Sequence, residues 1–145
     1  MINKLIVAIS CAWLCQVALA ETCPSVNEIK RNALSNWKAY DSDEGTPLPP
    51  TREAQLIRTA EQFVLAEWAT GKNKHGSIHC YYRDSTGSSL EAYFAKENVV
   101  PKKTTNNFWY EVSGFMHCAA GMDKCEFEKS LLQSPTMKNR QLAKR

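Results

Sequence analysis

The sequence of 145 residues lacks several features that would define a function directly. It has no glycine-rich phosphate-binding loop, no G-x-S-x-G nucleophile motif and no H-E-x-x-H zinc motif. It has no internal repeat and no segment typical of an interdomain linker. The body of the chain carries no basic stripe of the kind that nucleic-acid binding requires, so we expect no nucleic-acid partner. These absences favour one domain without a familiar catalytic signature.

Long apolar runs are also scarce, and the one run, residues 5–14, lies close to the N-terminus. It is too short for a good transmembrane helix, so we expect no stable membrane insertion. It follows Lys4 and precedes Ala18-Leu19-Ala20, which places small residues at the −3 and −1 positions. This order is typical of a secretory signal peptide. We therefore expect residues 1–20 to be a signal peptide cleaved after Ala20, with an uncleaved anchor as the alternative.

Export changes the interpretation of the cysteines. Cys23, Cys80, Cys118 and Cys125 follow the expected cleavage site, and four cysteines in a small exported domain predict two disulfides. Three pairings are possible; the segment containing Gly121 can fold back, which favours Cys118–Cys125 and leaves Cys23–Cys80. A zinc site is the weaker alternative because the sequence has no C-x-x-C pair. We expect no bound metal and no cofactor.

The charge distribution separates the body from the C-terminus. Residues 21–134 are long enough for a single core. Residues 135–145 contain four basic residues and no acidic one: Lys138, Arg140, Lys144 and Arg145. We expect this segment to be a basic, disordered tail that is simply solvated, with contact to an anionic membrane or an acidic partner as the alternative.

Hydrophobic periodicity and capping residues predict the elements of the first half. Ser25 and Glu28 form a capping-box pattern, so we expect a short helix over residues 25–34. An extended segment at 36–40 and an acidic, proline-rich loop at 41–50 follow. Residues 51–69 favour a helix, although 63–68 also fit a strand.

The second half is rich in strand patterns. The predicted strands cover residues 77–83, 90–95, 108–112 and 115–118, with a turn at 84–88 and a loop at 98–107. A short closing helix is expected over residues 124–132, with an irregular segment held by Cys125, Phe127 and Leu131 as an equal alternative. The predicted fold class is therefore α+β: a small antiparallel β-meander with one or two packed helices, stapled by disulfides.

Two His-Cys dipeptides offer the strongest candidate chemistry. His79 precedes Cys80 and His117 precedes Cys118, both in predicted strands. Because side chains alternate along a strand, cysteines that face the core would turn both histidines outward to an exposed surface. A metal or catalytic role for these two histidines is the less favoured alternative, and Asp84, Glu91 and Glu111 mark no catalytic carboxylate pair.

The aromatic residues slightly favour a binding module over an enzyme, with ordinary partial exposure at a sheet edge as an equal alternative. Consecutive aromatics at 81–82 and 108–110 must send some side chains outward. Tryptophan and tyrosine left at a surface commonly anchor interfaces. The candidate interface residues are Trp37, Trp68, Tyr82, Trp109 and Tyr110.

The order of these features resembles a known family. It comprises Cys23-Pro24, Ile29, Trp37, a proline-rich loop, Phe63-x-x-Ala66-x-Trp68, Cys80-Tyr81-Tyr82, Pro101, Trp109, Cys118 and Cys125-x-Phe127. This order is similar to that of the EirA family, small exported proteins of bacteria that replicate inside host cells. The chain departs from the family pattern at Glu126, where a proline is expected, and in its basic tail.

The resemblance implies a function without catalysis. EirA-like proteins are periplasmic, virulence-associated proteins that support the Dot/Icm (type IVB) secretion system. We therefore expect a periplasmic accessory protein that contacts protein partners of the cell envelope, secretion-system components among them. The alternatives are a small secreted inhibitor or ligand-binding module and, less favoured, a hydrolase that uses His79, His117 and nearby carboxylates.

Overall fold

The computed structural model describes residues 19–70 and 76–131. Residues 1–18 of the expected signal peptide and the whole of the expected tail, 135–145, lie outside the described residues. The signal peptide and the tail therefore stay predictions.

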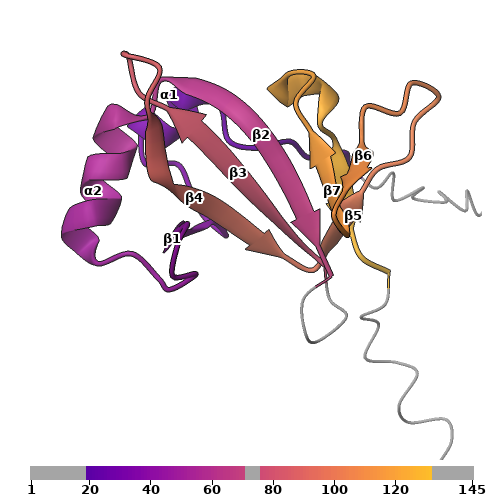
Figure 1. The fold of residues 1–145 in the computed structure, drawn as a ribbon, viewed down its shortest axis with the longest axis horizontal. Coiled ribbons are helices and arrows are strands. Elements are labelled where there is room, and N and C mark those ends of the chain that lie inside the picture. The colour runs from indigo at the N-terminus through magenta and orange to yellow at the C-terminus, as the bar shows by residue number, and fades with distance from the viewer. Residues whose placement is uncertain (1–18, 71–75, 132–145) are drawn as a thin grey trace, which may run out of the picture.

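Two antiparallel sheets and two helices make up the described fold (Figure 1). The main sheet has six strands, in the order β1 (Lys38–Asp41), β4 (Ser89–Glu97), β3 (Ser77–Arg83), β2 (Gln62–Ala69), β7 (Phe115–Cys118) and β6 (Tyr110–Val112). The second sheet pairs β5 (Val99–Pro101) with β8 (Phe127–Lys129). The two α-helices are α1 (Val26–Lys30) and α2 (Pro50–Thr59), and a short 3-10 helix, η1 (Met122–Lys124), lies between β7 and β8. The predicted α+β class is confirmed.

The predicted helix start at Ser25 is confirmed by its capping contacts. The Ser25 hydroxyl accepts a hydrogen bond from the Glu28 backbone N–H, and the Glu28 carboxylate accepts one from the Ser25 backbone N–H. The two contacts satisfy donors that a helix start otherwise leaves unpaired. Helix α1 ends at Lys30, and Asn32 then adopts a positive φ of 53°, which takes the chain out of the helical path.

The favoured prediction of one helix over residues 51–69 is wrong in its second half. Helix α2 ends at Thr59, and Ala60 is extended, so the chain turns into β2. β2 is an inner strand that pairs with β3 on one side and with β7 on the other. Helical periodicity within 51–69 is a local signal, and the hydrogen bonds of two neighbouring strands outweigh it.

Two smaller predictions are also corrected. The predicted loop at 98–107 contains β5, and the predicted closing helix at 124–132 is replaced by η1 and β8. Phe127 exchanges backbone hydrogen bonds with Glu21, and β8 pairs with β5. Pairing with two distant segments therefore holds this stretch extended.

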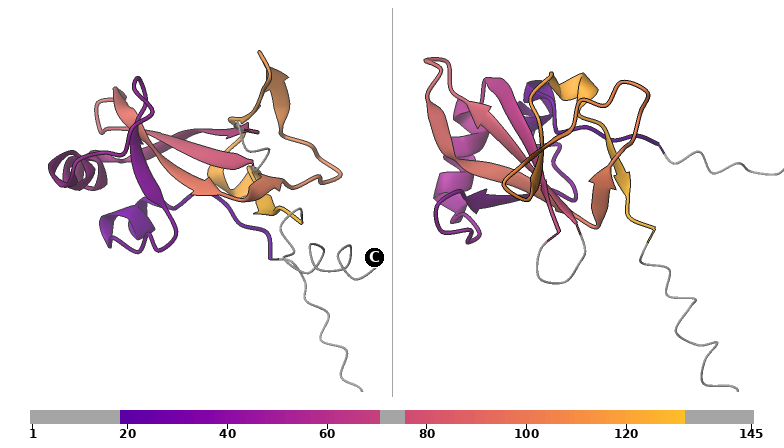
Figure 2. Two further views of the ribbon diagram at one scale, coloured as in Figure 1. Left: turned by 90° about the horizontal axis from the view of Figure 1, so that it is seen from below. Right: turned by 45° about the vertical axis from the view of Figure 1, so that its right-hand side comes forward.

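Both favoured disulfides are present. Cys23–Cys80 links the segment before α1 to the middle of β3, and Cys118–Cys125 joins the end of β7 to the residue that follows η1. All four cysteines are buried in the core. The left view of Figure 2 shows α1, in indigo, and β8, in yellow, on the same side of the main sheet. The disulfides therefore tie the covering segments to the inner face of the sheet.

Candidate functional site

The outer face of the main sheet carries the histidines. Alternation along β3 turns Ile78, Cys80 and Tyr82 into the core. His79 and Tyr81 therefore point to the other face, which is turned to the viewer in Figure 1. No helix of the described residues crosses this face (Figure 1). The prediction that buried cysteines turn the histidines outward is thus confirmed.

Glu67 of β2 lies between the two histidines. It stands opposite His79 of β3 and opposite His117 of β7. Its Oε2 lies 2.9 Å from His117 Nε2, and its Oε1 lies 3.5 Å from His79 Nδ1. The Tyr81 hydroxyl donates a hydrogen bond of 3.4 Å to Oε1. We call Glu67, His79 and His117 the Glu67 cluster.

The cluster is half-buried, which corrects the expectation of exposed histidines. The side chains of His79 and His117 are 21% and 19% exposed, because each lies against Glu67 and an aromatic neighbour. Hydrogen bonding to His79, and secondarily to His117, lowers the pKa of Glu67, although burial opposes the shift. Burial and the negative charge of Glu67 raise the pKa of Tyr81. The carboxylate therefore stays ionised and holds both imidazoles in place.

The cluster does not form a metal centre in this arrangement. Within residues 19–70 and 76–131, no group of three or more histidine, cysteine or acidic side chains is placed to hold a metal ion. The two imidazoles are directed at the carboxylate itself and not at a shared vacant point. Chemically, a carboxylate between two imidazoles can accept and return a proton.

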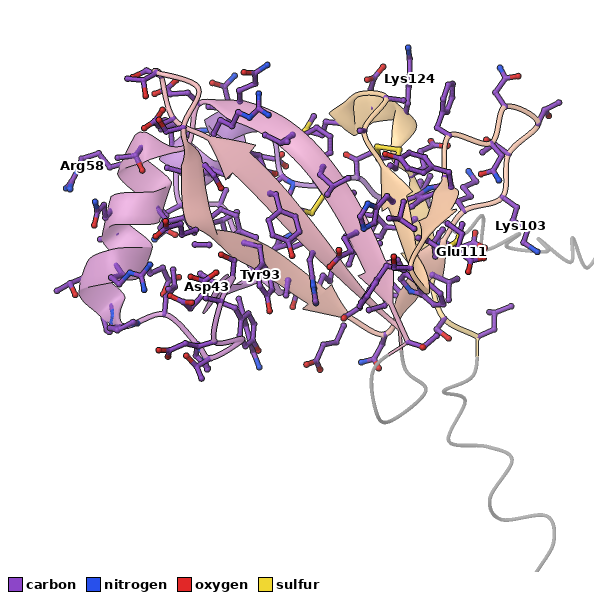
Figure 3. The ribbon with its side chains drawn as sticks, in the orientation of Figure 1. Asp43, Arg58, Tyr93, Lys103, Glu111 and Lys124 are labelled. Atoms are coloured by element: carbon purple, nitrogen blue, oxygen red, sulfur yellow. A yellow bond between two sulfur atoms is a disulfide. The ribbon has the colours of Figure 1, made fainter. Side chains whose placement is uncertain are left out.

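Aromatic rings continue the outer face beyond His79. Tyr93, labelled in Figure 3, stacks on His79 with ring centroids 4.4 Å apart. Tyr81 and Tyr40 lie on its other sides at 5.3 and 5.7 Å. Tyr93 is thereby buried under its neighbours, so this part of the face is a packed aromatic layer.

The β6–β7 hairpin extends the same face with exposed apolar side chains. Ser113 and Gly114 form its turn with φ values of 50° and 86°, as a two-residue type I′ hairpin requires. The exposed fractions are 50% for Tyr110, 38% for Val112 and 40% for Phe115. Val112 pairs with Phe115, and Tyr110 pairs with His117, so all three apolar side chains share the face of His117. We call Tyr110, Val112 and Phe115 the hairpin face.

The hairpin also forms the free edge of the main sheet. β6 pairs only with β7 among the described strands. At the opposite edge, β1 is covered, because Asp41 and Ala39 exchange backbone hydrogen bonds with Thr46 and Leu48. An uncovered edge strand can pair with a strand from another chain.

A groove lies on the other side of β7, between the two sheets. Its apolar wall comprises Trp68, Val100, Pro101, Trp109 and Met116, and its volume is about 490 Å³. Lys102, Lys103 and Glu128 also line it. We call this space the inter-sheet groove.

The structure separates the candidate interface residues into different places. Tyr110 is exposed on the hairpin face, whereas Trp68 and Trp109 line the inter-sheet groove. Trp37 is half-buried and packs edge-on against Phe127, with Lys96 over its ring.

Tyr82 corrects the interface prediction. It is 2% exposed, and its hydroxyl donates to the Pro24 carbonyl, so it is a core residue and no surface anchor. At consecutive aromatic positions the inward member cannot be identified until the strand register is known.

The sequence analysis missed Glu67, Val112 and Phe115. If residues 63–68 are read as a strand, alternation places Glu67 on the face opposite to that of Ala66 and Trp68. The favoured helix prediction concealed this signal. The carboxylates considered instead lie elsewhere: Glu91 and Glu111 are exposed, and Asp84 accepts hydrogen bonds within its own turn.

Comparison with known proteins gives no family assignment. No family model, curated protein or solved structure matches this chain. Within the described part of the chain, no helix has the length and apolar character needed to cross a membrane.

Proposed function

We propose that this chain is an exported, periplasmic interaction protein that acts by docking a partner protein on the β6–β7 hairpin and not by catalysis. The observation that carries the proposal is the hairpin face, where three exposed apolar side chains lie together. Surface aromatics grouped in this way are typical of interface anchors. The disulfides support export, because such bonds form and persist in oxidising compartments.

The free edge of β6 suits a partner that adds an extended segment. Because Val112 and Phe115 close a two-residue hairpin, their backbone groups pair with each other, and those of Glu111 point to the free edge. A partner strand would pair with Glu111 and cover the neighbouring apolar side chains. The sequence resemblance to the EirA family adds the class of partner: an envelope component of a Dot/Icm-type secretion system.

The test is cross-linking in intact cells, followed by purification of the protein and identification of what is bound. The variant Tyr110→Ala/Phe115→Ala should lose the secretion-system components that the wild type retains. Asp43→Ala/Arg58→Ala is the control, because both residues are exposed and lie at the far end of the molecule from Glu111 (Figure 3). Equal recovery with the hairpin variant and the wild type would refute the docking site. Recovery of no secretion-system component would refute the partner class.

The mode of docking has its own test. Glu111→Pro removes the outward backbone N–H and leaves the hydrogen bonds to β7 in place. Glu111→Ala removes the same side chain and keeps the N–H. Loss of binding with proline alone, at unchanged melting temperature, supports strand addition; equal binding by both variants refutes it.

A second candidate function is hydrolysis by general acid–base catalysis. One observation favours it: His79 and His117 both lie against Glu67, on an open face. The purified protein would be assayed on chromogenic esters and phosphodiesters. An activity that Glu67→Gln abolishes would support this candidate, and no activity, or an activity indifferent to that change, would reject it.

A further inference from the structure

We infer that the inter-sheet groove is a binding site for a small amphiphile with an apolar body and one anionic head. The groove lies where the inner sides of β2 and β7 face β5. Its volume of about 490 Å³ is within the range of small-molecule sites. It is independent of the hairpin face, because Met116 lines the groove while Phe115 and His117 point to the opposite side of β7.

Two indole rings, held in place by hydrogen bonds, form the part of the groove that suits the apolar body of the ligand. Trp68 Nε1 donates to the Val99 carbonyl at 2.8 Å, and Trp109 Nε1 donates to the Glu126 carbonyl at 3.0 Å. Both polar atoms are thus satisfied by backbone of the second sheet and its flanking residues. Trp109 is 5% exposed and Trp68 is partly buried, so Trp68 offers most of the indole carbon surface to an occupant. Gly76 makes room for this arrangement, since a Cβ there would lie 2.1 Å from Trp68 Nε1.

The remaining wall completes an apolar slot. Val100, Pro101 and Met116 add aliphatic and thioether surface, and each is only partly buried. A bound apolar chain would therefore remove this surface from water and gain the hydrophobic term. Methionine also adapts its shape to an irregular ligand.

The two lysines at the groove favour a ligand with an anionic head. Lys102 and Lys103 lie side by side on the loop after β5, and Lys103 marks this loop at the right of Figure 3. Neither lysine forms a salt bridge with another described residue. Glu128 is the only acidic residue of the lining, so the groove carries a net positive charge. A carboxylate head would pair with a lysine, and a cationic head would be repelled.

The same charges argue against the chain's own C-terminus as the occupant. Residues 135–145 contain four basic residues and no acidic one. Their charge matches that of Lys102 and Lys103, so the groove disfavours them. A separate anionic molecule is the occupant that the lining fits.

The probe is decanoate, compared with decanol and decyltrimethylammonium, which share its ten-carbon chain and differ in head charge. Binding is measured by calorimetry on the purified protein and by the side-chain indole N–H signals in NMR spectra. The signals of Trp68 and Trp109 should shift with saturation at one site, and Trp37, which lies outside the groove, is the internal reference.

Two variants and a control distinguish the contribution of the lysines to binding from that of the apolar wall. Lys102→Gln/Lys103→Gln should weaken decanoate binding about tenfold, as expected for the loss of a charge-assisted pair, and change decanol binding less than twofold. Met116→Trp should fill the groove and abolish both. Lys38→Gln, at an exposed position of strand β1, is the charge control and should change neither.

Two results would overturn the inference. One is that decanoate shifts no indole signal of Trp68 or Trp109 in a saturable way. The other is that the cationic amphiphile binds as tightly as decanoate. Either result leaves the hairpin proposal intact, because Tyr110 and Phe115 do not line the groove.

Discussion

Removing the Cys23–Cys80 disulfide should destabilise the protein more than removing Cys118–Cys125. The first bond closes a loop with a sequence separation of 57, and the second closes one of only 7. A cross-link restricts the unfolded chain, and its stabilising effect grows with the logarithm of loop length. The loop-entropy relation gives about 4.2 kcal/mol for the long loop and about 2.4 kcal/mol for the short one at 25 °C. The expected difference in the free energy of unfolding is therefore about 2 kcal/mol.

The assay is urea unfolding of Cys23→Ala/Cys80→Ala and Cys118→Ala/Cys125→Ala under oxidising conditions. All four cysteine residues are exposed to 1% or less, so the packing loss is similar in the two variants and largely cancels in the comparison. Mass spectrometry of the unreduced variants checks that the remaining bond has formed. Equal losses of stability, or a larger loss for Cys118→Ala/Cys125→Ala, would refute the loop-entropy reasoning.

Three further predictions concern single residues. Glu67→Gln should reduce the loss of stability that the protein shows on acidification. The folded-state pKa of Glu67 is lowered, mainly by its hydrogen bond to His79. The stability that the ionised Glu67 contributes is therefore present above its unfolded-state pKa and is lost as the pH falls through its folded-state pKa. Melting temperatures of variant and wild type between about pH 5 and about pH 3 check this, and parallel curves would contradict it. Tyr82→Phe leaves the Pro24 carbonyl without its buried donor and should cost about 1–2 kcal/mol in urea unfolding; no change would show that the contact is dispensable. Gly114→Ala should lower the free energy of unfolding by about 1 kcal/mol in the same assay, because alanine is strained at the φ of 86° found there. No atom lies within 4 Å of the added Cβ, so a steric clash does not contribute. An unchanged stability would exclude backbone strain as the reason for glycine at this position.

Much of the fold follows from local signals. The capping box at Ser25 and Glu28 sets the start of α1, and strands β3, β4, β6 and β7 follow from alternation and turn residues. The cysteine pairing follows in part from Gly121, which adopts a φ of 123° between Cys118 and Cys125. These features are local because each depends on residues a few positions apart.

The candidate site was less predictable, because its parts come from distant segments. Glu67 meets His117 across 50 residues of sequence, and the contact exists only because β7 pairs with β2. The groove likewise needs β5 and β8 to form a separate sheet facing β2. The sequence patterns within β5 and β8 are too short to reveal this pairing.

The sequence alone therefore determined an α+β chain with a disulfide framework, a capped first helix and histidines opposite the cysteines on their strands. Tertiary structure alone decided that Gln62–Ala69 form a strand, that Tyr82 is buried while Tyr110 is exposed, and that two histidines share one carboxylate. The physical reason is the same in each case. Strand pairing fixes which neighbour lies opposite and which face is covered, and that information resides in contacts between segments far apart in the chain.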